Sequence, residues 1–282
     1  MIRIYFPDIN LDDTFDCGQC FRWNRQGESF IGVVSGEEVT VYKDGDFLCI
    51  ESEKDEEFWK KYFGYELPSS LRDTSIGEGG LVLQRAMECG KGIRILRQEP
   101  WETLISFIIS QNNNIPRIKG IIKRLCENFG NNPATLCVPP LQERGIWAFP
   151  TPQELIGKDL SIIRAGFREK YILAAAEKCN GSFLQDIEEL PTDELREELM
   201  SICGVGPKIA DCVMLFSFGR YEVFPKDVWI KRVMLEQFGV ENKNIDVYVE
   251  KNFGTNAGYI QQYLFHYYRN VISKKHSCSL CL

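Results

Sequence analysis

Long apolar runs are missing from this chain of 282 residues. No stretch approaches the roughly 18–20 apolar residues that a membrane-spanning helix needs, so we expect no membrane partner. The start of the chain lacks a basic segment followed by an apolar one, so we expect no secretory signal. We therefore expect a cytoplasmic protein, associated with the nucleoid if the source is bacterial, in which the eleven cysteines are reduced thiols.

Charge leaves nucleic acid open as a partner without favouring it. Acidic residues outnumber basic ones by 40 to 33, which gives a net charge of −7. Binding depends on the local field rather than on this sum, and Pro116–Arg124 carries four basic residues and no acidic one.

Gly77–Gly80 is rich in glycine, but no Gly-Lys-Ser or Gly-Lys-Thr follows it, so it matches no phosphate-binding loop.

The hydrophobic pattern changes along the chain. Between Cys20 and Ser52 apolar residues recur with a period of two, and turn signals separate the runs, which predicts a small antiparallel sheet. From Trp101 onward the period is about 3.6, which predicts helices. We expect an α+β fold that is mostly α, with a sheet-bearing domain at residues 1–97 and a helical domain at residues 98–282.

Leu190–Gly219 is the most informative stretch of the sequence. It predicts a helix–hairpin–helix at about residues 192–219, in which the first helix ends at Cys203 and the second begins near Pro207. The hairpin Gly204-Val205-Gly206 allows positive φ angles and close approach of another backbone. Its amides and the new helix N-terminus form an anion site that suits a DNA phosphate. A helix–turn–helix corner without a ligand remains the alternative.

Lys208 lies at the start of the second predicted helix, where a neutral amine would be a nucleophile for an electrophilic carbon. The alternative is an ordinary solvated lysine. Asp227 follows nineteen residues later, after a short apolar approach. Its presence favours a reactive Lys208, and its alternative role is to cap the next helix.

Four segments together resemble one family of enzymes. The hairpin segment with Phe-Pro-Lys-Asp-Val resembles the helix–hairpin–helix, Gly/Pro-rich loop and catalytic aspartate of a DNA glycosylase superfamily. Three further motifs resemble its 8-oxoguanine DNA glycosylase/lyase family, and the resemblance covers nearly the whole chain. These motifs are Gly18-Gln19-Cys20-Phe21-Arg22-Trp23, Gln111-Asn112-Asn113-Asn114-Ile115-Pro116-Arg117-Ile118 and Ala165-Gly166-Phe167-Arg168-Glu169-Lys170-Tyr171.

The resemblance implies a bifunctional repair enzyme whose partner is double-stranded DNA containing 8-oxoguanine, and we expect it to act as a monomer. Lys208 would displace the damaged base and form a Schiff base, after which the strand is cut by β-elimination. Asp227 would stabilise the positive charge on the sugar. The target nucleotide would be flipped out of the stack.

The resemblance also assigns residues to the flipped base. Gly18 would offer its main-chain carbonyl, and Gln261 would read the Watson–Crick edge, because a carboxamide donates and accepts at once. Cys212 and Phe265 would sandwich the base. Both lie on predicted helices, so ordinary core packing is the alternative for these two.

Four more residues would act on the opposite strand. Asn112 would fill the vacated space, Arg117 and Arg168 would hold the unpaired cytosine, and Phe167 would wedge beside it. Phosphate binding is the alternative for the two arginines, and a polar helix C-terminus is the alternative for the asparagines. Cytosine is therefore the expected opposite base.

Three positions depart from the pattern of eukaryotic members of the family. Phe167 replaces a tyrosine, Cys20 replaces a serine, and Trp229 replaces a histidine that contacts phosphate. Tryptophan carries no charge, so the phosphate contact at this position is in doubt.

We expect no required cofactor. Related branches carry four closely spaced cysteines for an iron–sulfur cluster, whereas this chain ends with only Cys278 and Cys281, so we predict no cluster. We also predict no zinc site, because the resemblance places the other C-x-x-C pair, Cys17 and Cys20, in the lesion pocket. A monovalent or divalent cation on the hairpin carbonyls is the one metal that the resemblance allows. Those carbonyls belong to Met200, Ile202 and Val205.

Two other functions fit parts of the sequence. A monofunctional glycosylase for alkylated bases has the same fold and the aspartate but lacks the lysine, so Lys208 argues against it. A non-catalytic helix–hairpin–helix DNA-binding module would need neither Asp227 nor a pocket.

Overall fold

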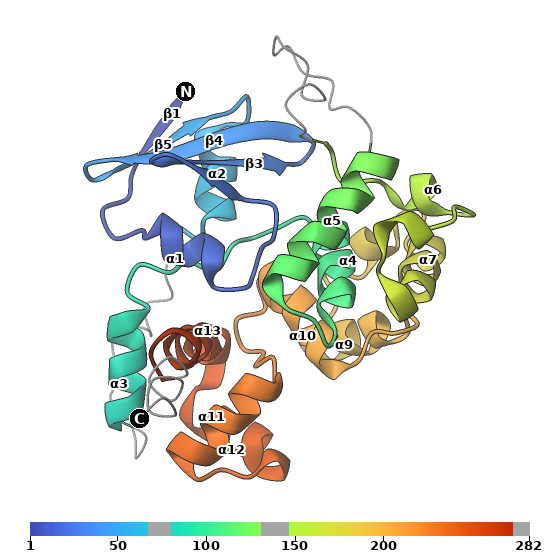
Figure 1. Cartoon of the computed structure of the whole chain (residues 1–282). Helices are drawn as coiled ribbons and strands as arrows, with labels where there is room; N and C mark the ends of the chain where they lie inside the picture. The colour runs from blue at the N-terminus through green and yellow to red at the C-terminus, as the bar shows by residue number, and fades with distance from the viewer. Residues whose placement is uncertain (67–79, 131–146, 273–282) are drawn as a thin grey trace, which may run out of the picture.

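The computed structural model describes residues 1–66, 80–130 and 147–272 (Figure 1). Its first part is a five-stranded antiparallel sheet with the strand order β1-β5-β4-β3-β2. The predicted meander is confirmed, and in β4 the buried Val39 and Val41 alternate with partly buried residues, as expected for a strand with one face on the core. The strands are β1 (Ile2–Tyr5), β2 (Asn24–Gln26), β3 (Ser29–Val34), β4 (Glu37–Asp44) and β5 (Phe47–Glu51).

The remainder of the described chain is helical, which confirms the predicted α+β class with mostly α content. Figure 1 shows the sheet with α1 and α2 beside it, and the later helices grouped on the other side of the molecule. The bounds are α1 Leu11–Asp16, α2 Glu56–Tyr62, α3 Gly80–Cys89, α4 Pro100–Ser110, α5 Ile115–Phe129, α6 Pro152–Leu155, α7 Glu169–Lys178, α8 Phe183–Asp186, α9 Thr192–Met200, α10 Pro207–Phe216, α11 Val228–Phe238, α12 Ile245–Asn252 and α13 Ala257–Tyr267, with short 3₁₀ turns at Ser161–Ile163, Gly166–Arg168, Asn242–Asn244 and Gly254–Asn256.

Two hydrophobic cores hold these elements together. One lies between the sheet, α1 and α2, where the side chains of Trp59 and Phe63 are fully buried. The other fills the helical part, and α3 packs against α13 within it. Cys17, Leu83 and Ile95 already belong to the second core while Leu96 belongs to the first, so the chain passes between the two cores more than once before Trp101. The domain boundary at residues 97–98 stays a prediction.

No helix in the described ranges is both long and apolar enough to cross a bilayer.

The helix–hairpin–helix forms where the sequence predicted it. Helix α9 ends at Met200 rather than at Cys203, because the Ile202 N–H turns back to the Leu199 carbonyl at 3.2 Å. Gly206 is the N-cap of α10 and Pro207 is its first residue. Gly204 has φ +88°, and a Cβ on it would lie 2.4 Å from the Cγ of Tyr171. Glycine is therefore required at position 204 by both conformation and space.

Replacing each hairpin glycine with alanine tests this requirement. Gly204→Ala should lower the free energy of unfolding by about 1–3 kcal/mol, because it adds backbone strain and a clash with Tyr171. Gly206→Ala is the matched control, since φ there is −100° and no atom lies within 4 Å of the added Cβ. Its unfolding free energy should stay within about 0.5 kcal/mol of the parent. Urea denaturation measures both, and equal losses would contradict the steric account.

Candidate active site

The predicted lesion-binding residues line one small pocket between four parts of the chain. Gly18 follows α1, Lys208 and Cys212 lie on α10, Asp227 precedes α11, and α13 supplies the rest of the set. The members on α13 are Gln261 and Phe265, with Gln262 beside them. The structure thus brings together residues as far apart in the sequence as Gly18 and Phe265.

Lys208 faces an aromatic and a thiol group. Its Nζ atom lies 5.1 Å from the ring centroid of Phe107, and its positive charge acts to lower the pKa of the Cys212 thiol, one helical turn further along α10. Burial raises the pKa of the Cys212 thiol to about 12, so this group is neutral at physiological pH. The wall beside the lysine is therefore uncharged and suited to the face of a flat ring.

Asp227 is both the predicted helix cap and a half-buried charge. Its side chain accepts a hydrogen bond from the Ile230 N–H at 2.7 Å, which makes it the N-cap of α11. Burial raises the pKa of its carboxyl group, while this backbone hydrogen bond and the charge of Lys208 act in the opposite direction. The cap and the electrostatic role are therefore compatible, because the same contact fixes the carboxylate beside the pocket.

Gln261 has an unsatisfied polar atom at the pocket. The residue is buried, and its side-chain oxygen has no hydrogen-bond partner among the described residues. A buried acceptor without a partner costs free energy, typically about 1–3 kcal/mol. A ligand that donates a hydrogen bond in this pocket would remove that cost. Core packing does not account for this residue.

Gly18 needs to be glycine for local reasons. Its φ of +83° is unfavourable for other residues, and an added Cβ would lie 3.3 Å from a ring carbon of Phe265. The free pocket has a volume of only about 50 Å³, compared with the ~30 Å³ that one water molecule takes up in the liquid. The partly buried Phe265 ring lines this space beside Gly18.

Two buried glutamines, to which the sequence analysis gave no role, hold the Gly18 loop. The Gln19 carboxamide donates to the carbonyls of Thr14 (2.9 Å) and Arg94 (2.7 Å) and accepts from the Leu96 N–H (2.8 Å). The Gln262 carboxamide donates to the Cys17 carbonyl at 2.8 Å. Gln19 lies in the Gly-Gln-Cys motif, so the sequence already pointed to this position. Nothing in the sequence indicates that Gln262 would bind a loop 245 residues away.

The residues predicted for the opposite strand also lie together. Asn112 follows α4 in a left-handed conformation with φ +46°, and Arg117 is exposed on the first turn of α5. Phe167 is 52% exposed, and the Arg168 guanidinium lies 4.4 Å from the centroid of its ring. Gln111 ties this group to the hairpin, because its carboxamide donates to the Gly204 carbonyl at 3.2 Å.

Arg168 is positioned differently from Arg117. It is buried, and its guanidinium donates to the carbonyls of Gln111 (2.9 Å), Asn112 (3.0 Å) and Ala165 (3.0 Å). Burial, with the nearby Arg117 charge, lowers its pKa. These bonds fasten the Asn112 turn, so most donors of Arg168 serve the protein itself in this conformation.

The remaining predicted sites are less defined. Of the proposed cation ligands, the Ile202 carbonyl already accepts a hydrogen bond from the Val205 N–H at 3.0 Å, and the cation stays a prediction. Trp229 packs beside Tyr268, with ring centroids 6.0 Å apart. Cys278 and Cys281 lie outside the described residues.

Comparison with known proteins agrees with this geometry. Residues 1–104 match the family model for the 8-oxoguanine DNA glycosylase N-terminal domain. Residues 105–256 match the model for HhH-GPD superfamily base excision DNA repair proteins. A curated N-glycosylase/DNA lyase of Saccharomyces cerevisiae is 39% identical over 171 residues, which are 55% of this chain and 44% of that protein. The match thus spans less than half of the yeast protein.

Solved structures match over nearly the full length. MBOgg1 in complex with a low-affinity DNA ligand is 42% identical, with a TM-score of 0.84 and coverage of 94% of this chain and 93% of that one. The 8-oxoguanine glycosylase/lyase of Clostridium acetobutylicum, solved with double-stranded DNA containing cytosine opposite 8-oxoG, is 37% identical. Its TM-score is 0.82, with coverage of 93% and 92%. The chain therefore belongs to the 8-oxoguanine DNA glycosylase/lyase family of bifunctional DNA N-glycosylases and AP lyases, within the HhH-GPD superfamily.

Proposed function

We propose that this protein excises 8-oxoguanine opposite cytosine from duplex DNA and then cuts the strand through a Schiff base on Lys208. The observation that carries the proposal is the pocket in which Lys208, Asp227 and the unpaired Gln261 oxygen meet. A lysine in this pocket supports lyase chemistry and argues against a monofunctional glycosylase. The Clostridium acetobutylicum enzyme was solved with duplex DNA that carries cytosine opposite 8-oxoG, and the yeast relative is named an N-glycosylase/DNA lyase.

The chemistry assigns one task to each residue. The Lys208 amine bonds to C1′ of the flipped nucleotide as the bond to the base breaks, and the base leaves with the electron pair and takes up a proton. The sugar ring opens to give the Schiff base. Loss of a proton from C2′ then expels the 3′ phosphate. Asp227 stabilises the positive charge that develops on the sugar in the first step.

Recognition of the base rests on hydrogen-bond donors. 8-Oxoguanine carries a proton on N7, whereas guanine has a bare acceptor there, so a main-chain carbonyl of Gly18 facing N7 would favour the lesion. With guanine, the buried Gly18 carbonyl would face the N7 acceptor without a hydrogen bond, which costs about 1–3 kcal/mol. The Watson–Crick edges of guanine and 8-oxoguanine are alike, so Gln261 would not distinguish these two bases. It would instead select guanine-type bases over adenine-type ones. Neutral Cys212 and the Phe265 ring supply the two faces of the sandwich.

Lys208→Gln should abolish borohydride trapping and both chemical steps while binding to lesion DNA persists. The substitution removes the nucleophile but keeps a polar side chain of similar length. Lys226→Gln is the matched control, since Lys226 is paired with Asp246 and does not line the pocket. Trapping and nicking of an 8-oxoguanine duplex measure the outcome. Nicking by Lys208→Gln would overturn the assignment.

Asp227→Asn should lower the excision rate by about 10²–10³-fold, the effect of losing one preorganised electrostatic stabiliser. Its melting temperature should hold, because the carboxamide oxygen can still accept from the Ile230 N–H. Asp227→Ala should lose both rate and the cap, the latter worth about 1 kcal/mol. If the Asp227→Asn protein melts at a lower temperature but excises at the parent rate when folded, Asp227 serves only as the N-cap of α11.

The pH dependence of Asp227 follows from its raised pKa. Excision needs the carboxylate, so it should fall on acidification at a pH above the ordinary aspartate pKa of about 3.9. The folded pKa exceeds the unfolded one, so the folded state binds this proton more tightly. As pH falls through the folded pKa, the parent should therefore gain stability relative to Asp227→Asn while losing activity.

Arg117 and Arg168 should affect the opposite base differently. Arg117 is exposed, so Arg117→Ala should remove a cytosine preference worth about 1–3 kcal/mol. Arg168→Lys loses the bonds that fasten the Asn112 turn, so excision should slow for all four opposite bases with the preference retained. Single-turnover excision opposite C, A, G and T measures both. An unchanged preference in Arg117→Ala would reduce Arg117 to a phosphate ligand.

A further inference from the structure

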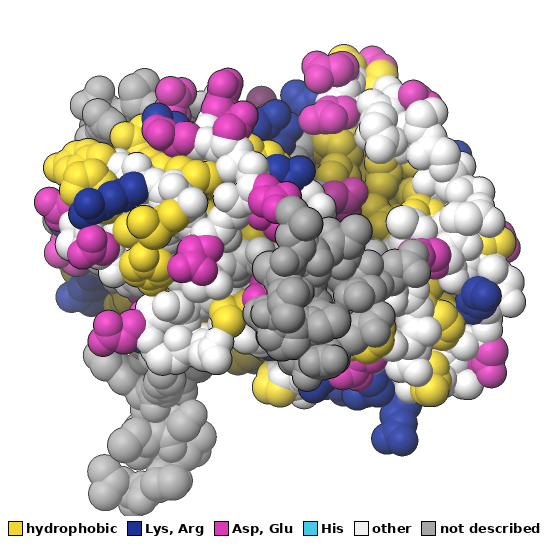
Figure 2. Space-filling model, turned by 90° about the horizontal axis from the view of Figure 1, so that it is seen from above, with side chains coloured by type: hydrophobic (Ala, Val, Ile, Leu, Met, Phe, Trp, Pro, Cys, Tyr) yellow, Lys and Arg dark blue, Asp and Glu magenta, His cyan; other side chains and the backbone are white. Residues whose placement is uncertain are grey.

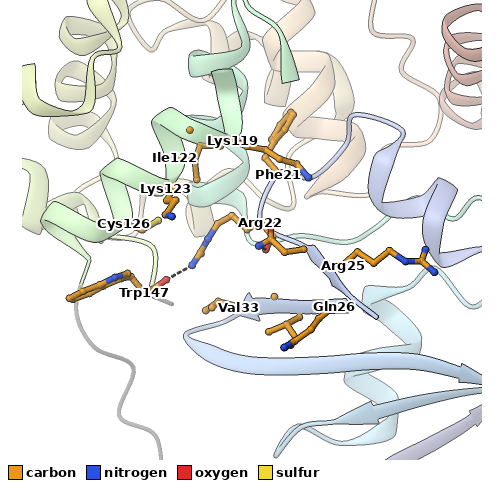
Figure 3. A pocket seen from close by; sticks show the side chains of 14 residues that line it. Phe21, Arg22, Arg25, Gln26, Val33, Lys119, Ile122, Lys123, Cys126 and Trp147 are labelled. Carbon is orange, nitrogen blue, oxygen red and sulfur yellow. Dashed lines mark hydrogen bonds between the residues drawn. The ribbon is translucent and has the colours of Figure 1, made fainter. Parts of the chain in front are cut away.

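A second cavity lies away from the lesion pocket, between β2, β3 and α5. Figure 3 shows it from close by, with Val33 and Gln26 of the sheet on one side and Lys119, Ile122, Lys123 and Cys126 of α5 on the other. Its volume is about 490 Å³, within the roughly 300–1,000 Å³ that is usual for small-molecule sites. It is therefore large enough for one nucleotide.

The charge of this sheet–helix cavity has one sign. Arg22, Arg25, Lys119 and Lys123 line it, and no aspartate or glutamate among the described residues does. Arg22 and Arg25 are already paired with Glu102 and Asp12. Lys119 donates to the neutral Trp23 carbonyl, at 3.4 Å, and the 69% exposed Lys123 forms a long ion pair of 3.6 Å with Glu127. Among the described lining residues, Lys119 and Lys123 are therefore the two cations left for an anion.

Arg22 makes one end of the cavity rigid. Its side chain is only 12% exposed, and it bonds Glu102 at 2.8 Å and the Trp147 carbonyl, a contact drawn in Figure 3. Trp147 and Phe21 supply aromatic surface to the lining, and burial keeps the Cys126 thiol neutral by raising its pKa to about 12. Aromatic side chains combined with cations are the usual surface for stacking a base near its phosphate.

Gly120 is an independent observation in favour of a ligand. It lies inside α5, where glycine is less stable than alanine. Nothing in the fold requires it, because a Cβ there would approach only the Nη1 atom of Arg124, at an ordinary 3.5 Å. It does line the cavity. A missing side chain at this place leaves room for close approach by a ligand.

We propose that the sheet–helix cavity binds one nucleotide unit, an aromatic base with its phosphate. The phosphate pairs with Lys119 and Lys123, and the base lies against Trp147 and Phe21. Figure 2 shows basic and acidic side chains interspersed over this face of the molecule rather than one basic face. The nucleotide is either free or part of the bound DNA, since Arg117 lies two residues before Lys119 on the same helix.

Calorimetric titration of the full chain with guanosine monophosphate tests the proposal, with guanosine and inorganic phosphate as partial ligands. The parent should bind the nucleotide more tightly than either part. Gly120→Leu fills the cavity and should weaken nucleotide binding by about tenfold or more, whereas Lys251→Met on the distant α12 should not change it. Should Gly120→Leu fail to fold, the Lys119→Met/Lys123→Met double variant must show the same loss.

A second arm identifies the source of the nucleotide. In a Lys208→Gln background, which should not cut DNA, Gly120→Leu should weaken lesion-duplex binding if the duplex supplies the nucleotide, and guanosine monophosphate should then compete with DNA. If the ligand is free, DNA affinity should be unchanged and both should bind together. No binding of guanosine monophosphate together with unchanged DNA affinity overturns the proposal. Trapping on Lys208 is measured separately, so this failure leaves the proposed function untouched.

Discussion

The site depends on buried amide and guanidinium side chains that hold loop backbones in place. Gln19 and Gln262 fix the loop that carries Gly18, and Gln111 and Arg168 fix the Asn112 turn and connect it to the hairpin. These loops contain left-handed residues, which are costly unless the surroundings hold them. The functional groups are therefore positioned by hydrogen bonds to backbone carbonyls, on a scaffold of packed helices.

The same logic explains the electrostatics of the lesion pocket. Burial keeps the Cys212 thiol neutral, so this thiol adds no charge beside Lys208, and Asp227, whose pKa burial raises, is the acidic group there. A carboxylate in such a place acts more strongly than in water, because screening is weak. The helix cap with Ile230 keeps that carboxylate from turning away, so a contact that stabilises α11 also orients the site.

Most of the fold was predictable because its signals are local. The period-two strands, the proline and glycine of the hairpin, and the Asp227 cap all depend on neighbouring residues. β1 was missed, because its four residues pair with β5, which lies more than forty positions later in the chain. The partners of Gln262 and Arg168 were missed for the same reason, since no local pattern specifies which distant carbonyl a buried donor will meet.

The closed lesion pocket adds a constraint on recognition. Its free volume is small, about 50 Å³, and the Phe265 ring lies against Gly18 at one wall. The unpaired Gln261 oxygen makes the closed state less favourable than a filled one, because only a donor from outside satisfies it. A base that offers that donor opens the pocket at lower net cost than one that does not. Under the proposed function, selection would thus begin as the base enters the pocket, before Lys208 reacts.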